Sequence, residues 1–165
     1  ADGARTLLRI EGFAASVAYR VDQLKALLTR FGAEMEEMGA DASADLWADV
    51  RDVRVFQGTS GDVWRVSCKP SDAPALAQAA QADARLFDCA GGLIWLLVPE
   101  GCDLRARLDG FGGHATLVRG AAATRAKVPV FQPELPGVAR LSAGLRQRFD
   151  PRGILNAGLM GGSAG

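Results

Sequence analysis

Two strand-like runs on either side of a tight turn constrain the fold of this chain more than any other feature. Residues 84–90 (ARLFDCA) and 92–100 (GLIWLLVPE) are joined at Ala90-Gly91-Gly92, a composition typical of a β-hairpin. Because the second run is apolar throughout, we expect it to be buried in the interior of a sheet. The hairpin therefore predicts an antiparallel sheet with residues 92–100 as a central strand.

Three further runs have strand character. Residues 62–69 (DVWRVSCK) alternate, with Trp64, Val66 and Cys68 on one face and Arg65, Ser67 and Lys69 on the other. This alternation indicates a strand with one wet face and places Cys68 in the core. Thr6–Glu11 (TLLRIE) predicts a first strand, and residues 114–120 (HATLVRG) predict a last one.

The most regular helical pattern covers Ser16–Phe31. Its apolar residues recur at spacings of four, three, four and three, with Ser16 as the predicted N-cap and Gly32 just past the end. Apolar spacing and capping residues predict four further helices: a short one around Asp45–Val50, an alanine-rich one capped by Ser71 or Asp72, one over Asp103–Phe111 and one over Val138–Phe149.

The predicted elements follow the order β-α-(α)-β-α-β-β-α-β, then a proline-rich extended connection over residues 125–136 and a final helix. Two split βαβ units in this order predict an α+β fold, a ferredoxin-like antiparallel sheet with helices packed on one face. A length of 165 residues suits a single domain, 1–165. Because the sequence starts without a methionine or a signal-type segment, we expect it to be cut from a longer chain.

Composition excludes several classes of protein. Nineteen Lys and Arg residues against nineteen Asp and Glu residues give a net charge of zero, so nucleic acid is not an expected partner. No apolar run approaches the ~20 residues of a membrane span. The three cysteines, Cys68, Cys89 and Cys102, form neither a metal-ligand spacing nor a disulfide framework, which favours a reducing, cytoplasmic setting.

The sequence lacks the common catalytic motifs. His114 is the only histidine, so a site for zinc or another transition metal is not expected. There is no G-x-S-x-G, no Walker loop and no strand-linked G-x-G-x-x-G, which argues against triad hydrolysis and against a self-contained nucleotide site. The sequence therefore predicts no catalytic and no metal-binding residue.

Basic residues gather near the end of the chain, where Arg140, Arg146, Arg148 and Arg152 are opposed only by Asp150. Two explanations fit this pattern. In the first, cations near a helix C-terminus complement the helix dipole and the rest form a solvated face. In the second, this end of the chain meets an anionic ligand.

Residues 148–160 (RFDPRGILNAGLM) resemble the closing motif of FAD-linked oxidases of the vanillyl-alcohol oxidase type. Residues 7–28 (LLRIEGFAASVAYRVDQLKALL), 62–76 (DVWRVSCKPSDAPAL) and 91–101 (GGLIWLLVPEG) are similar to the C-terminal half of FAD-binding subunits of bacterial glycolate oxidases. The resemblance implies a C-terminal cap domain, a ferredoxin-like layer that closes over FAD held by an N-terminal domain absent from this sequence.

The resemblance also implies a site at the tail. Asn156 matches the asparagine of the motif and is the expected contact with the flavin or its domain, while Pro151 fixes the turn before it. Gly153 and Gly158 are expected to adopt conformations that a Cβ hinders. The expected cationic neighbours of the FAD phosphates or of the reduced, anionic flavin are Arg146, Arg148 and Arg152.

The sequence departs from the family pattern in two places. Ala157 stands where the motif has a proline, and the histidine-rich metal motif of the catalytic relatives is absent. The resemblance is therefore to the subunit that accompanies the catalytic flavin subunit.

In the intact assembly the resemblance implies oxidation of glycolate to glyoxylate, with lactate or another 2-hydroxy acid as alternative substrates. The implied cofactor is FAD. The implied partners are the N-terminal FAD domain, the catalytic flavin subunit and an iron–sulfur subunit that takes the electrons. The isolated domain is expected to be inactive and to be located in the cytoplasm, or at the periphery of the inner membrane through partner subunits.

An alternative function of another class remains open. The chain is then a ferredoxin-like subunit-interaction or ligand-binding module without flavin chemistry. In this interpretation the open face of the sheet, or the extended residues 128–136 (VPVFQPELP), mediates association.

Overall fold

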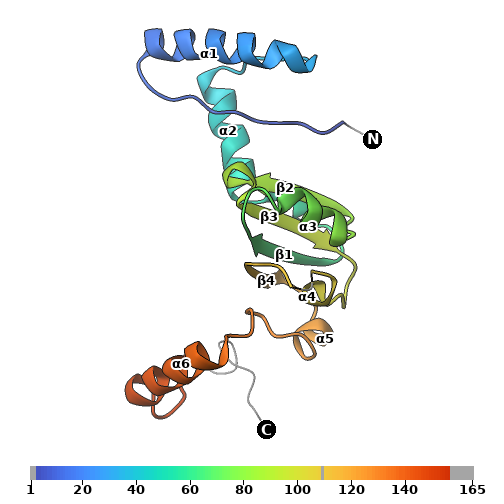
Figure 1. Ribbon diagram of the computed structural model, residues 1–165, viewed down its shortest axis with the longest axis vertical. Coiled ribbons are helices and arrows are strands. Elements are labelled where there is room, and N and C mark those ends of the chain that lie inside the picture. The colour runs from blue at the N-terminus through green and yellow to red at the C-terminus, as the bar shows by residue number, and fades with distance from the viewer. Residues whose placement is uncertain (1–2, 109, 157–165) are drawn as a thin grey trace. The chain divides into compact units, whose positions relative to one another are not determined.

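The computed structural model describes residues 3–108 and 110–156 of the chain. They form an α+β structure with a four-stranded antiparallel sheet and several helices, which confirms the predicted structural class. The chain divides into two compact units, Ala1–Val55 (unit 1) and Phe56–Gly165 (unit 2). Unit 2 contains the sheet (Figure 1).

Unit 1 contains the helix with the most regular sequence pattern. α1 (Ala14–Leu28) continues into a 3-10 turn. Gly32 follows that turn in the left-handed conformation, with φ 65°, as expected for a glycine at a helix end. The predicted N-cap is wrong, because Phe13 precedes the first turn and Ser16 lies inside the helix.

The predicted first strand, Thr6–Glu11, is not a strand in the structure. These residues have no regular secondary structure, and the regular elements in the described part of unit 1 are helical. The second of these helices, α2 (Ala40–Arg51), begins earlier than the one expected around Asp45–Val50. A strand needs a neighbour that satisfies its N–H and C=O groups. The apolar pattern of Thr6–Glu11 is therefore not sufficient to make it a strand.

The sheet of unit 2 has the strand order β2-β3-β1-β4, and each neighbouring pair is antiparallel. Its strands are β1 (Asp62–Ser67), β2 (Ala84–Asp88), β3 (Leu93–Val98) and β4 (His114–Arg119). All four strands lie within runs predicted from the sequence. β2 and β3 form the predicted hairpin, and the apolar β3 lies in the interior of the sheet, between β2 and β1. The helices described in unit 2 are α3 (Ala73–Ala79), α4 (Leu104–Arg107), α5 (Ala122–Arg125) and α6 (Pro136–Phe149).

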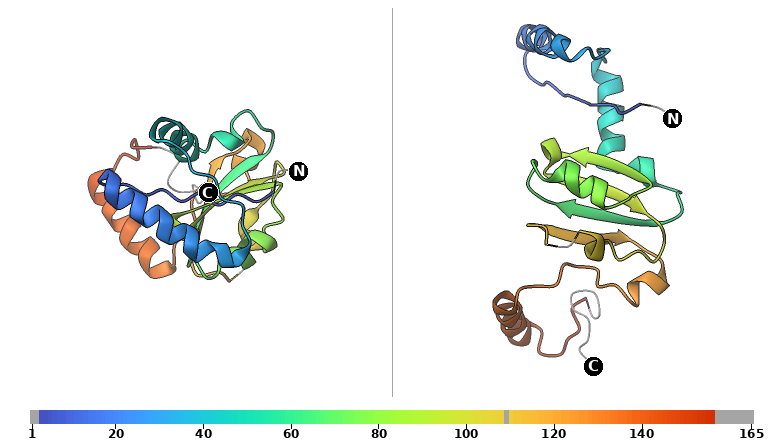
Figure 2. Two further views of the ribbon diagram at one scale, coloured as in Figure 1. Left: turned by 90° about the horizontal axis from the view of Figure 1, so that it is seen from above. Right: turned by 45° about the vertical axis from the view of Figure 1, so that its right-hand side comes forward.

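One face of the sheet carries the main hydrophobic core. The alternation of side chains along β1, β3 and β4 gathers there a set of buried residues, namely Trp64, Val66, Ile94, Leu96, Val98, Ala115 and Leu117. α3 and α4 contribute Ala73 and Leu104 to the same cluster, and α3 lies over the strands in Figures 1 and 2. Cys68, predicted to lie in the core, is only partly buried and packs against the cluster.

Asp62, at the start of β1, is a fully buried carboxylate. It accepts hydrogen bonds from the Gly101 N–H (2.8 Å), the Ala121 N–H (3.2 Å) and the Thr124 hydroxyl (3.0 Å). A buried charge is tolerated when its lone pairs are satisfied in this way. Asp62 therefore ties β1 to the loop after β3 and to the segment after β4.

The predicted proline-rich connection runs along the outer edge of β4. The Leu117 N–H donates to the Val130 carbonyl at 2.9 Å, and the Ala115 N–H donates to the side-chain oxygen of Gln132 at 3.1 Å. Pro129 has no N–H, so a regular strand cannot form here. Residues 128–132, the strap, therefore close this edge of the sheet from within the chain.

The three cysteines differ in exposure, and this leads to a testable difference in reactivity. Cys89 is exposed, whereas Cys68 and Cys102 are partly buried, and burial raises the pKa of both of these thiols. Because the thiolate is the reactive form, we expect dithionitrobenzoate at pH 8 to modify Cys89 first. Cys68 and Cys102 should react several-fold more slowly, at rates that increase further as the pH is raised. A fast phase that persists in the Cys89→Ala variant would contradict this assignment.

Candidate functional site: the C-terminal arm

The C-terminal arm, residues 133–156, carries the residues predicted to meet a cofactor. It comprises residues 133–135, the helix α6 and the loop that follows, coloured orange to red in Figure 1. α6 begins at Pro136, slightly before the predicted Val138, because a proline is well tolerated in the first turn of a helix. Arg146 and Arg148 lie in its last turn, where cations complement the helix dipole. Helix stability thus accounts for part of the basic cluster.

One side of α6 is an apolar stripe. Val138, Leu141, Leu145 and Phe149 recur at spacings of three, four and four, which places them on one face of the helix. Their exposed fractions lie between 50% and 75%, and no residue of α6 is buried. A helix of 14 residues is only marginally stable in water without tertiary packing. The stripe therefore needs a surface to pack against.

Two of the predicted arginines border this stripe. At about 100° per residue, Arg148 lies about 20° from Leu141 on one side of the stripe, and Arg146 lies about 60° from Phe149 on the other. By the same geometry Arg140 is on the far side of the helix. Arg146 and Arg148 therefore do not converge on one point; they frame an apolar surface with positive charge.

The Asp-Pro segment after α6 forms a compact turn. The carboxylate of Asp150 accepts hydrogen bonds from the N–H groups of Ile154 and Leu155, both at 2.9 Å. The Gly153 N–H donates to the Asp150 carbonyl at 3.0 Å, and Gly153 has φ 61°, a conformation that favours glycine as expected. The sequence reasoning missed the role of Asp150, although an Asp before Pro is a known turn-former whose side chain bonds nearby backbone N–H groups.

The turn presents apolar and amide side chains to solvent. Ile154 and Leu155 are 62% and 63% exposed. Asn156 is also exposed and has φ 49°, a left-handed conformation that asparagine tolerates better than most residues. Pro151 lies in the turn as predicted, whereas Ala157 and Gly158 lie outside the described residues.

The arrangement of the arm suits binding more than catalysis. Arg146, Arg148, Arg152 and Asn156 are all exposed, and residues 133–156 contain no histidine or cysteine. Across residues 3–108 and 110–156, no group of three or more His, Cys, Asp or Glu side chains is placed to hold a metal ion. His114, at the start of β4, is exposed. The helices of the same ranges include none that is long and apolar enough to span a membrane.

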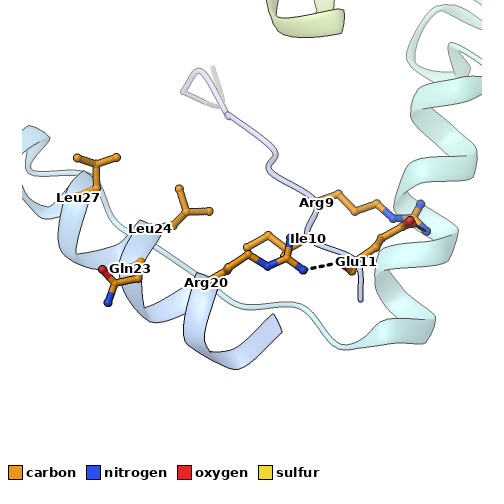
Figure 3. A pocket seen from close by; sticks show the side chains of 7 residues that line it. All are labelled: Arg9, Ile10, Glu11, Arg20, Gln23, Leu24 and Leu27. Carbon is orange, nitrogen blue, oxygen red and sulfur yellow. Dashed lines mark hydrogen bonds and ion pairs between the residues drawn. The ribbon is translucent and has the colours of Figure 1, made fainter. Parts of the chain in front are cut away.

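A depression in unit 1 is a second candidate site (Figure 3). It lies between the extended residues Arg9–Glu11 and one side of α1, where Arg20, Gln23, Leu24 and Leu27 line it. Arg9 pairs with the Glu11 carboxylate, and Arg20 donates to the Glu11 carbonyl. Because both guanidinium groups are already engaged, the depression is a poor site for an anionic ligand. The arm remains the stronger candidate.

Comparisons of the chain with protein-family models, with curated proteins and with solved structures gave no match.

Proposed function

We propose that this chain is the C-terminal cap domain of an FAD-linked oxidase subunit of the glycolate oxidase type, and that its arm docks onto the domain that holds FAD. The observation that carries the proposal is the arm. An exposed apolar stripe is bordered by Arg146 and Arg148 and ends in the hydrogen-bonded turn of the Asp-Pro motif. The residues of this turn are among those by which the sequence resembles the family.

The order of elements in unit 2 supports a ferredoxin-like arrangement as part of this proposal. β1, α3, β2, β3, α4 and β4 follow one another along the chain, and the strand order is β2-β3-β1-β4. Two interleaved βαβ units with antiparallel neighbours have this order. Such a layer leaves α6 and the loop after it outside the repeated core, where they are available to another domain.

The residues of the arm fit a contact with FAD but not a complete FAD site. Exposed guanidinium groups of Arg148 and Arg152 are suited to phosphate oxygens, and the side-chain amide of Asn156 can both donate and accept hydrogen bonds. The sequence has no glycine-rich phosphate loop between a strand and a helix. FAD would supply the chemistry of accepting a hydride equivalent, and this chain would contribute closure and positive charge.

The remaining parts of the proposal concern the assembly. Its reaction is the oxidation of glycolate or another 2-hydroxy acid, with electrons passing to an iron–sulfur subunit beside the catalytic flavin subunit. Its location is the cytoplasm, or the inner membrane surface through those partners. The isolated chain is proposed to be inactive, because the residues predicted to contact FAD do not form a complete site on their own.

Absorbance spectra of two proteins test the proposed function. The longer parent subunit, purified with FAD present, should show the visible absorbance bands of an oxidised flavin. The 165-residue chain under the same conditions should show none. A colourless parent, also when its partner subunits are present, would contradict the proposal and favour an interaction module without flavin.

Removing a cation that borders the stripe is expected to weaken FAD binding. In the full-length subunit, Arg148→Ala should lower FAD affinity by about tenfold, because hydrogen bonds to charged groups contribute about 1.5–3 kcal/mol. Titration of the apoprotein with FAD measures this, and the flavin reduction potential should fall because a cation favours the anionic reduced form. Arg140→Ala, on the far side of α6, is the matched control. Equal flavin content and potential in both variants would remove Arg148 from the site.

A further inference from the structure

The base of the C-terminal arm is held to the sheet by side chains where a strand would use its backbone. On the outer edge of β4 the Ala115 N–H donates to the Gln132 side-chain oxygen at 3.1 Å. The Ala115 carbonyl accepts from Arg105 Nη2 at 2.7 Å and from Arg105 Nε at 3.1 Å. Both backbone groups of Ala115 are therefore satisfied by side chains that come from outside β4.

Arg105 connects this edge to the strap. Besides the Ala115 carbonyl, its guanidinium donates to the Pro129 carbonyl at 2.7 Å and to the Val130 carbonyl at 2.9 Å. The group also lies 4.8 Å from the centre of the buried Trp64 ring, within the range of a cation–π contact. Arg105 thus joins α4, β4, the strap and the core in one set of contacts.

The position of these contacts along the chain gives them a second consequence. Gln132 is the last residue of the strap, and α6 begins four residues later at Pro136. Pro133 and Pro136 restrict the backbone between them. The point at which Gln132 and Arg105 hold the chain is therefore the point from which the arm leaves the sheet.

We propose that Arg105 and Gln132 are positioning residues that fix the base of the C-terminal arm and thereby set how the arm meets its partner domain. The partner in the second half of this statement is the FAD-holding domain, so that half rests on the proposed function. The first half concerns this chain alone. The two halves are measured separately.

Amide hydrogen exchange of the whole 165-residue chain, followed by NMR, tests the first half. Gln132→Leu keeps the size of the side chain but removes the acceptor, so the Ala115 amide should exchange about tenfold faster. Gln132→Glu keeps an acceptor oxygen, so in this variant the Ala115 amide should exchange at the wild-type rate. Gln23→Leu makes the same change at an exposed position of α1 and serves as the control. Unchanged exchange at Ala115 in Gln132→Leu would overturn the anchor.

The rate of FAD release from the full-length subunit tests the second half. Gln132→Leu and Arg105→Lys should release FAD at least about twofold faster than wild type, and Gln132→Glu should restore the rate. Ile94→Val, on β3, which does not pair with β4, weakens the buried core and should lower the melting temperature without changing FAD release. Faster Ala115 exchange with unchanged FAD release would overturn the positioning role and leave the proposed function intact. A wild-type parent that never holds FAD would overturn the proposed function and this second half, while the exchange result still decides the first.

Discussion

Replacing Asp62 by alanine is expected to lower the free energy of unfolding of unit 2 by about 3–5 kcal/mol. The carboxylate is fully buried and accepts from the Gly101 N–H, the Ala121 N–H and the Thr124 hydroxyl. Alanine accepts none of these hydrogen bonds, so the Ala121 N–H and the Thr124 hydroxyl would lose their acceptor in a closed environment, and the Gly101 N–H would keep only its longer hydrogen bond to the Thr124 hydroxyl oxygen, at 3.1 Å. Each buried donor left unsatisfied costs about 1–3 kcal/mol.

Urea unfolding followed by far-UV circular dichroism measures this effect. Thr124→Val removes one of the donors together with its share of the desolvation cost, so it should cost only about 1 kcal/mol. Asp83→Ala, at an exposed position of unit 2, is the matched control and should change the free energy of unfolding by no more than about 0.5 kcal/mol. If Asp62→Ala were as mild as Asp83→Ala, the carboxylate would not be the link that joins β1 to the loops around it.

The parts of the fold that could be predicted are those written in local patterns. The alternation in residues 62–69 and the two runs around Ala90-Gly91-Gly92 predict β1 and the β2–β3 hairpin, and the apolar spacing in Ser16–Phe31 predicts α1. In each case the residues that decide the structure are close neighbours in the sequence. The bounds shift by a few residues because capping depends on contacts beyond the pattern.

The parts that could not be predicted depend on residues far apart in the chain. Thr6–Glu11 has a strand-like pattern, but pairing requires a free edge that the pattern does not specify. Asp62 looks like an ordinary charged residue before a strand, and its donors lie 39–62 residues away. A sequence pattern shows which residue types alternate or recur, but it does not show which distant backbone groups will surround a carboxylate.

Some features of the candidate site also follow from local sequence, and others depend on residues far apart in the chain. The Asp-Pro turn, the left-handed Gly153 and the helix before them follow from local sequence. That Arg146 and Arg148 lie on opposite borders of an apolar stripe also follows once the helix bounds are known. The contribution of Arg105 could not be inferred, because it reaches across 24 residues to the Pro129 carbonyl and 25 to the Val130 carbonyl.

The second large effect on stability is expected when a side chain is added at Gly113, just before β4, but not at the neighbouring Gly112. A Cβ on Gly113 would lie 2.1 Å from the Ser67 carbonyl oxygen and 2.9 Å from the Phe111 ring, whereas a Cβ on Gly112 would meet nothing within 4 Å. Ser67 is the last residue of β1 and pairs with His114, so its carbonyl cannot move away without disturbing the sheet. We therefore expect Gly113→Ala to lower the free energy of unfolding by about 3 kcal/mol or more, and Gly112→Ala to change it by about 0.5 kcal/mol in either direction.

The comparison of these two variants isolates a steric cause. Both replace glycine by alanine one residue apart, so differences in helix or strand propensity and in unfolded-chain entropy largely cancel. Parallel thermal melts should show a drop of roughly 6–12 °C for Gly113→Ala, at about 2–4 °C per kcal/mol for a chain of this size. If the two variants had the same melting temperature, the chain entering β4 would not pass as close to the end of β1 as the structure places it. The pairing of Ser67 with His114 would then be wrong. Because the strap, Gln132 and the arm are all held through β4, that register also fixes where the candidate site begins.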